Sequence, residues 1–411
     1  MEDHKIFTFS NGIRLIHKQV NNTKIIHCGI IINIGSRDEL KDQQGIVHFW
    51  EHMAFKGTKK RKAYQIINIL ESVGGELNAF TTKEKICFYA SVLDAHFNKT
   101  ISLLTDITFN SIFPSVEIEK EKKVILDEMQ MYLDLPNESL QDDFETLLFA
   151  DHPMGRNILG NEKSITSFKH IDFLQFIRKN LNDSRIVISI VGNVPALRCR
   201  KIVEKHVCGI QLPAGNLNRI PPEALHAKSQ VLKKNISRSY CAIGNTAYPV
   251  NDLNRMKFFM LTNIIGGPAM NSRLNMELRE KRGLVYSVDA SYTPYSDTGV
   301  FGIFFGTEKK QLERCIRLIN AELKKLKTIH LGTLQLHKSK EQIIGQLAMA
   351  EENNVNLMIM LGRSLLDLGY VQVLDDIFNE IRKIQAGEII QMANEIFNEN
   401  EISCLVYDSN N

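Results

Sequence analysis

The strongest constraint on the fold of this chain is that one order of predicted elements occurs twice within its 411 residues. In the first half, strand-like runs at both ends enclose several helical patterns, and an Asn11-Gly12 turn joins the first two strands into a hairpin. The second half returns to this order, with a helix that stops at Gly266-Gly267. Each half also ends with a helix that leads into an apolar strand. We therefore expect two related domains.

The residue patterns place strands and helices alternately along both halves. The predicted strands lie at 6–9, 13–17, 24–35, 76–81, 86–93 and 185–191, and then at 229–246, 284–305 and 402–407. The predicted helices lie at 44–56, 63–73, 94–108, 115–133, 137–149 and 171–181, and then at 252–265, 271–281 and 389–397. This order predicts an α+β fold of two homologous domains, each a mainly antiparallel sheet covered on one face by helices.

A stretch rich in proline and glycine marks the boundary between the two halves. It runs from Gly209 to Pro222 and contains Pro213, Gly215 and Pro221. We therefore expect an N-terminal domain at 1–208, a linker at 209–224 and a C-terminal domain at 225–411.

Charge and cysteine content exclude several classes of protein. The 50 Lys and Arg residues nearly balance the 47 Asp and Glu residues, so the net charge of +3 provides no basic surface for a nucleic acid. No apolar run approaches the roughly 18 residues of a membrane span. The seven cysteines are scattered, without a Cys-x-x-Cys pair, and the first residues lack an apolar signal segment. We expect a reducing compartment and a cytoplasmic location.

The most specific chemical signal is the string at residues 45–58, Gly-Ile-Val-His-Phe-Trp-Glu-His-Met-Ala-Phe-Lys-Gly-Thr. His48 and His52 are four positions apart, so on a helix both imidazoles project from one face and can bind one metal ion. Glu51 lies on the neighbouring edge, where its carboxylate can reach a water on the metal. This His-x-x-Glu-His order is the inverted zincin signature. Zinc fits best, because it accepts nitrogen and oxygen ligands and lowers the pKa of a bound water to about 7.

The five-residue motif also arises by chance, and a histidine pair on a helix is often only part of a core. Two features favour a metal site here. Aromatic and aliphatic residues flank the motif, and a second predicted helix at 116–132 is rich in acids that can supply the third protein ligand of a hydrolytic zinc site. Periodicity does not choose among these acids, most of which are expected on a solvated face. They are Glu117, Glu119, Glu121, Asp127 and Glu128.

Residues 45–58 closely resemble the signature of the pitrilysin (M16) family of metallopeptidases, especially its half-length branch related to the mitochondrial processing peptidase β subunit. In that family a third ligand, a glutamate, follows the second histidine at the spacing that separates Glu128 from His52, which is 128 − 52 = 76 residues. The resemblance therefore implies a zinc ion held by His48, His52 and Glu128. A family glutamate one heptad earlier corresponds to Glu121, which would orient a ligand.

Two further segments carry the resemblance. Residues 74–82 resemble the family's strand beside the zinc, which implies that Asn78 and Ala79 hold an extended peptide as an added strand. A plain strand after a glycine helix stop accounts for the same residues without a function. Residues 272–286 resemble the family's Arg/Tyr element, which implies that Arg279 and Tyr286 grip the substrate and stabilise the oxyanion.

Together these roles imply a zinc-dependent endopeptidase in which Glu51 is the general base. The helix of the second half that corresponds to the motif helix, near 253–265, contains no histidine, so one zinc ion per chain is expected. The family also includes core subunits of respiratory complexes that keep the fold without peptidase activity. A non-catalytic scaffold, or a peptide-binding partner of a heterodimeric peptidase, is therefore the alternative function.

The resemblance also implies an assembly. Full-length members of the family join four such units into a clamshell around a chamber, with the zinc in the first unit and the Arg/Tyr element in the fourth. This chain has two units, which implies a dimer in which Arg279 and Tyr286 of one chain complete the site of the other. A homodimer suffices, and a heterodimer with a degenerate relative is the alternative. The expected substrates are unfolded peptides.

Overall fold

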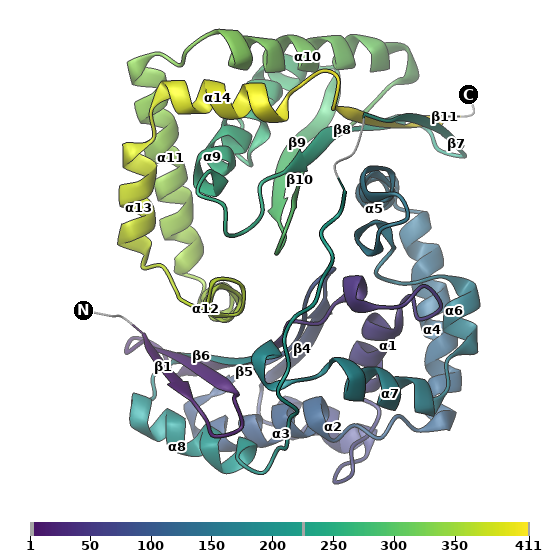
Figure 1. Cartoon of the computed structure of the whole chain (residues 1–411), viewed down its shortest axis with the longest axis vertical. Helices are drawn as coiled ribbons and strands as arrows, with labels where there is room; N and C mark the ends of the chain where they lie inside the picture. Colours follow the sequence, from purple (N-terminus) through teal and green to yellow (C-terminus); the bar gives the residue numbers. More distant parts are fainter. Residues whose placement is uncertain (1–3, 224–226, 410–411) are drawn as a thin grey trace. The chain divides into compact units, whose positions relative to one another are not determined.

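A computed structural model gives the structure of residues 4–223 and 227–409 (Figure 1). The first three residues and residue 224, the end of the expected linker, lie outside this described part. The chain divides into two compact units with one sheet each. The first unit comprises Met1–Met129, Arg156–Ile220 and Met349–Val373, and the second comprises Gln130–Gly155, Pro221–Ala348 and Leu374–Asn411.

The first unit contains a six-stranded sheet. Its strands, in spatial order, are β1 (Lys5–Thr8), β2 (Arg14–Gln19), β6 (Ile186–Gly192), β3 (Ile25–Ile32), β5 (Ile86–Leu93) and β4 (Glu76–Thr81). All neighbouring pairs are antiparallel except β2 and β6. Among the residues that the structure describes, β4 pairs with β5 alone, so β4 is an edge strand.

Helices cover both faces of this sheet. Four helices contact its strands on one face: α1 (Ile46–Met53), α2 (Ala63–Glu71), α3 (Phe97–Phe109) and α8 (Ala196–Val207). The unit also contains α6 (Glu162–Ser167), α7 (His170–Asn180) and most of α4 (Ser115–Leu133). On the other face, α12 (Asn354–Leu368) packs on β6 and β3 (Figure 1).

Strand β6 explains why this sheet needs cover on two sides. All seven of its residues are buried. Ile186, Ile188 and Ile190 belong to the main core of the unit, whereas Val187 and Val191 pack with residues of α12. Alternate side chains of a strand point to opposite faces, so an unbroken apolar strand requires an apolar layer on each side.

The second unit repeats this plan with five strands. In spatial order these are β7 (Ser229–Lys234), β11 (Ser403–Ser409), β8 (Ser239–Ala247), β10 (Gly299–Thr307) and β9 (Val285–Pro294), all antiparallel except β7 and β11. Its helices are α9 (Arg255–Gly266), α10 (Leu312–Thr328), α11 (Thr333–Glu351), α13 (Leu374–Lys383) and α14 (Ala386–Ile396). One further helix, α5 (Pro136–Phe149), packs on β11 and β8, and Phe144 meets Phe304 edge to face.

The fold class predicted from the sequence is confirmed, because the structure has two mainly antiparallel sheets in an α+β arrangement. The expected domain boundaries follow the order of the chain, whereas the compact units exchange one helix each. α12 comes from the second half of the sequence and belongs to the first unit, and α5 comes from the first half and belongs to the second unit. Each exchanged helix covers a sheet face that the prediction left open.

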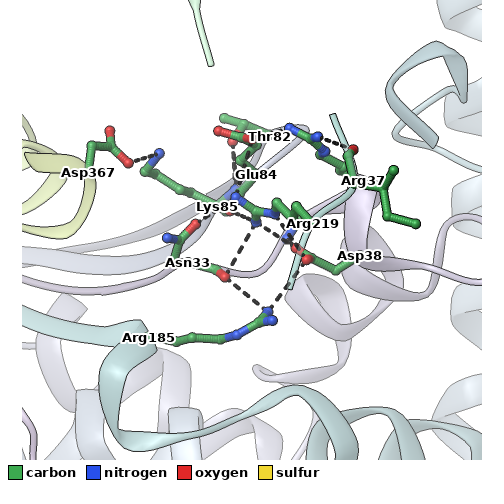
Figure 2. A network of polar contacts seen from close by, with 11 residues as sticks. Asn33, Arg37, Asp38, Thr82, Glu84, Lys85, Arg185, Arg219 and Asp367 are labelled. Atoms are coloured by element: carbon green, nitrogen blue, oxygen red, sulfur yellow. Dashed lines mark hydrogen bonds and ion pairs between the residues drawn. The ribbon is translucent and has the colours of Figure 1, made fainter. Parts of the chain in front are cut away.

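A buried network of charged side chains stabilises the loop after β3 and the turn between β4 and β5 (Figure 2). Arg219, from the expected linker, donates to Asp38 Oδ2 at 2.7 Å, Asn33 Oδ1 at 3.0 Å and the Glu84 carbonyl at 3.0 Å. Arg37 donates to Glu84 Oε1 at 2.7 Å. These contacts hold the segment around Arg219 on the first unit. The Arg219 guanidinium connects the loop after β3 with the turn between β4 and β5, which are distant in sequence.

Among the helices of the described residues, none is both long enough and apolar enough to cross a bilayer.

Candidate metal centre

At the start of helix α1, the buried carboxylate of Glu39 accepts hydrogen bonds from backbone N–H groups that have no partner within the helix. Gly45, the residue before the helix, has a φ of 88°, a left-handed conformation that favours glycine. Glu39 accepts hydrogen bonds from the N–H of Gly45 at 2.8 Å and of Val47 at 2.9 Å. Burial raises the pKa of Glu39 to about 8, although these two bonds act in the opposite direction. Phe49 and Trp50 anchor the apolar face of the helix in the core.

The opposite face of α1 brings two imidazoles close to one carboxylate of α4. His48 Nε2 lies 3.7 Å from Glu128 Oε1, and His52 Nε2 lies 3.4 Å from Glu128 Oε2. One ligand atom from each of the three residues lies within 4.8 Å of the other two. The structure therefore brings together the three residues that the resemblance names as zinc ligands.

Glu121, one heptad before Glu128 on α4, contacts the second histidine from behind. Its Oε2 lies 3.2 Å from His52 Nδ1, and its Oε1 lies 2.5 Å from Lys56 Nζ. A carboxylate on the distal nitrogen of an imidazole fixes the orientation of the ring and leaves Nε2 free for a metal. For His48 the corresponding atom, Nδ1, is buried without a hydrogen-bond partner among the described residues.

Glu51 lies beside the histidines on α1 and is held by the last residue of β4. The hydroxyl of Thr81 donates to Glu51 Oε2 at 2.5 Å. Burial raises the pKa of Glu51, and the Thr81 hydrogen bond and the His52 charge oppose this shift. A carboxylate with a raised pKa can take up and return a proton nearer to neutral pH than an exposed one.

The charges around this centre fit a divalent cation. Burial lowers the pKa of His48. Burial also acts to lower the pKa of His52, but the hydrogen bonds and charges of Glu121 and Glu128 outweigh it and raise that pKa to about 9. A proton on His52 thus stands between two carboxylates. Zinc binding requires a neutral imidazole, so the metal would displace this proton. The positive charge of the metal would then balance the two carboxylates in place of the proton.

The donor set supports zinc in particular. Two imidazole nitrogens and one carboxylate oxygen are the three protein ligands of many catalytic zinc sites, which keep a fourth position open. The other acids that periodicity left open on α4 lie elsewhere: Glu117 and Glu119 form ion pairs with lysines of their own helix, and Asp127 is exposed.

The predicted substrate-binding residues of the first unit lie on the edge strand β4. Asn78 is exposed, and Ala79 packs against the core on the side of α1. Since β4 has a strand partner on one side only, its other edge can accept a peptide as a further strand.

The predicted Arg/Tyr element belongs to the second unit. Tyr286, near the start of β9, is 81% exposed, and the guanidinium carbon of Arg279 lies 6.0 Å from the centre of its ring. Arg279 lies on a π-helical turn, Asn275–Glu280, where a regular helix near 271–281 was predicted. Such turns often occur at functional sites. The two side chains are thus neighbours, as their resemblance to the family element implies.

Sequence reasoning did not single out three residues that support this centre, namely Glu39, Lys56 and Thr81. The sequence did contain a signal for Thr81. Alternate residues of a strand point to the same face, so Thr81 lies on the same face of β4 as Leu77 and Ala79, the face towards α1. Glu39 and Lys56 gave no such signal, since their contacts are made by loops and by a neighbouring helix.

The helix-borne His-x-x-Glu-His motif is the inverted zincin signature, and it lies in the first of two similar α+β units. The chain belongs to the insulinase family, peptidase family M16. The sequence model of that family matches residues 14–162, and that of the peptidase M16 inactive domain matches residues 167–343.

Relatives agree with this assignment over nearly the whole chain, and two solved structures share its fold. The chain is 33% identical to the uncharacterised zinc protease YmxG of Bacillus subtilis, covering 99% of both chains. It is 32% identical to an uncharacterised zinc protease of Rickettsia bellii, covering 100% of this chain and 98% of the relative. A protease structure from Helicobacter pylori superposes with a TM-score of 0.91 at 21% identity, covering 98% of this chain and 99% of that one. A Pseudomonas fluorescens structure described as a peptidase M16 inactive domain gives 0.92 at 17% identity, covering 98% and 97%.

Proposed function

We propose that this protein is a zinc-dependent endopeptidase that binds one zinc ion per chain through His48, His52 and Glu128. The observation that carries the proposal is the convergence of these three donors beside Glu51, with Glu121 behind His52. The relatives named zinc proteases support the same activity. When bound, the ion would act as a Lewis acid and lower the pKa of a water at the site.

Glu51 would serve as the general base and acid. It would take a proton from the water that attacks the peptide carbonyl, and then pass that proton to the leaving amine. The Thr81 hydrogen bond holds one carboxylate oxygen of Glu51 in place and leaves the other free for the proton. The raised pKa of Glu51 suits both steps.

The substrate would bind as an extended peptide along the free edge of β4, next to Asn78 and Ala79. Main-chain hydrogen bonds of an added strand do not depend on side chains, so this mode favours unfolded peptides over folded proteins. Arg279 and Tyr286 would donate hydrogen bonds to the oxyanion of the tetrahedral intermediate.

The first experiment separates metal binding from catalysis. Glu51→Gln should keep zinc, measured by elemental analysis, and should cut no peptide in a defined peptide mixture followed by mass spectrometry. Glu128→Gln should lose zinc, whereas Glu119→Gln on the exposed side of the same helix should keep both zinc and activity. Full activity of Glu51→Gln would refute its role. Wild-type protein that binds zinc and peptide without turnover would instead indicate the peptide-binding alternative.

A homodimer in which the partner's Arg279 and Tyr286 complete each site has its own test. Glu51→Gln and Tyr286→Phe should each be inactive alone, and mixing them should restore part of the activity through subunit exchange. Each variant mixed with itself is the control. Exchange demonstrated by labelled subunits without any recovered activity would contradict the shared site.

A further inference from the structure

The second unit contains a cavity of about 480 Å³ beside Tyr286. The start of β9, the end of β10 and the first turn of α10 contribute to its wall. Tyr286 reaches this cavity with an exposed side chain. Any peptide that contacts Tyr286 would therefore pass the mouth of the cavity.

Cationic side chains dominate the lining. These are Arg238, Arg282, Lys310 and Arg314, and Glu308 is the carboxylate among the lining residues. Two of the cations are neutralised: Lys310 Nζ lies 2.9 Å from Glu308 Oε2, and Arg282 Nη1 lies 2.7 Å from Glu277 Oε1. The cavity therefore has an excess of positive charge.

The excess resides in two guanidinium groups. Arg238 and Arg314 form no ion pair within the described part of the chain. The planar guanidinium has donors in a fork that matches the two oxygens of a carboxylate or a phosphate. Two such groups on one cavity, next to the phenol of Tyr286, provide several donors, and Glu308 is the one carboxylate among the described lining residues.

We propose that this cavity is an anion-binding subsite formed by Arg238 and Arg314, which takes the carboxylate of an acidic residue in the peptide held by Tyr286. The choice of a peptide carboxylate as the ligand rests on the proposed peptidase function. Anion binding by the two arginines does not, because a free phosphate has similar chemistry and would bind the same two groups. The enzyme would therefore prefer peptides with an Asp or Glu at one fixed distance from the cut. The preference would weaken as ionic strength rises, because the two arginines are exposed.

The test compares the full-length, zinc-loaded protein with the double variant Arg238→Gln/Arg314→Gln. The matched control is Arg198→Gln/Lys201→Gln, which removes the same charge from exposed positions of α8. Cleavage of a defined peptide mixture gives the frequency of Asp and Glu at each position around the cut. Calorimetry with inorganic tripolyphosphate, on the Glu51→Gln background, measures anion binding without any need for activity.

We expect acidic residues to be enriched at one position in the wild type and in the control, and this enrichment to disappear in the double variant. Tripolyphosphate should bind at least about tenfold more weakly to the double variant, because the loss of one charge-assisted hydrogen bond alone weakens binding by about that factor. Tripolyphosphate binding that needs both arginines, without acidic enrichment, would identify a free anion as the ligand. If zinc-loaded protein cuts no peptide but this binding persists, the peptidase proposal fails and the subsite stands. Equal enrichment and equal binding in all three proteins would overturn the subsite.

Discussion

The hydroxyl of Thr81 donates a hydrogen bond of 2.5 Å to Oε2 of Glu51, and so joins the edge strand of the first sheet to the helix that carries both histidines. The strand expected to hold the peptide and the group expected to act as base are thus connected by one bond. Glu84 lies in the turn that follows Thr81, and its contacts with Arg37 and Arg219 hold this turn in place. The position of Glu51 therefore depends on residues far from it in the sequence.

Thr81→Val should lower kcat by roughly ten- to a hundredfold, the effect of removing a hydrogen bond to a charged group. Zinc content should not change, because Thr81 contacts no predicted ligand. Thr81→Ser keeps a hydroxyl and should restore most of the rate. Steady-state kinetics with zinc analysis tests this, and a valine variant with unaltered kcat would show that the bond does not position Glu51.

Glu121→Gln should weaken zinc binding by roughly ten- to a hundredfold, as for other residues that orient a ligating histidine. The amide cannot replace the carboxylate that contacts both His52 Nδ1 and Lys56. Competition with a chelator measures the affinity, and Glu119→Gln is the control. Equal affinity in all three proteins would remove Glu121 from the site.

Arg219→Met should lower the free energy of unfolding by about 3–5 kcal/mol, because it leaves the buried carboxylates of Asp38 and Glu84 short of a partner (Figure 2). Arg198→Met, at an exposed position of α8, should change it by less than about 0.5 kcal/mol. Chemical denaturation provides both values. A small effect for Arg219→Met would mean that the other members of the network suffice without it.

His17 should make the fold sensitive to acid. It is 1% exposed, and burial lowers its pKa to about 4 from an ordinary value of 6.5. The unfolded chain binds a proton on His17 below pH 6.5 while the folded chain does not, so stability is present above that pH and is lost as pH falls towards 4. By pH 5 the wild type should lose about 2 kcal/mol more than His17→Gln, relative to pH 7.5. Parallel pH slopes for the two proteins would contradict this.

Local patterns predicted most individual elements. The helix expected at 115–133 is observed as Ser115–Leu133, and the strands at 76–81 and 86–93 are observed as β4 and β5. Periodicity, turn residues and glycine stops act over a few residues, so they can be recognised without the rest of the chain. The exchange of α5 and α12 could not be recognised in this way. It depends on which sheet faces remain apolar after the strands of both halves have assembled.

The sequence by itself determined the repeated order of elements and the motif of His48, Glu51 and His52, because both can be recognised from local residue patterns without the packed structure. Only the tertiary structure decided which acid of α4 faces that motif, since periodicity treats Glu117, Glu119, Glu121, Asp127 and Glu128 alike until α1 packs against one side of the helix. Resemblance to a family named Glu128 and Glu121 in advance. The packing of α1 on α4 supplies the physical reason, because it brings these two carboxylates, and none of the other three, to the imidazoles.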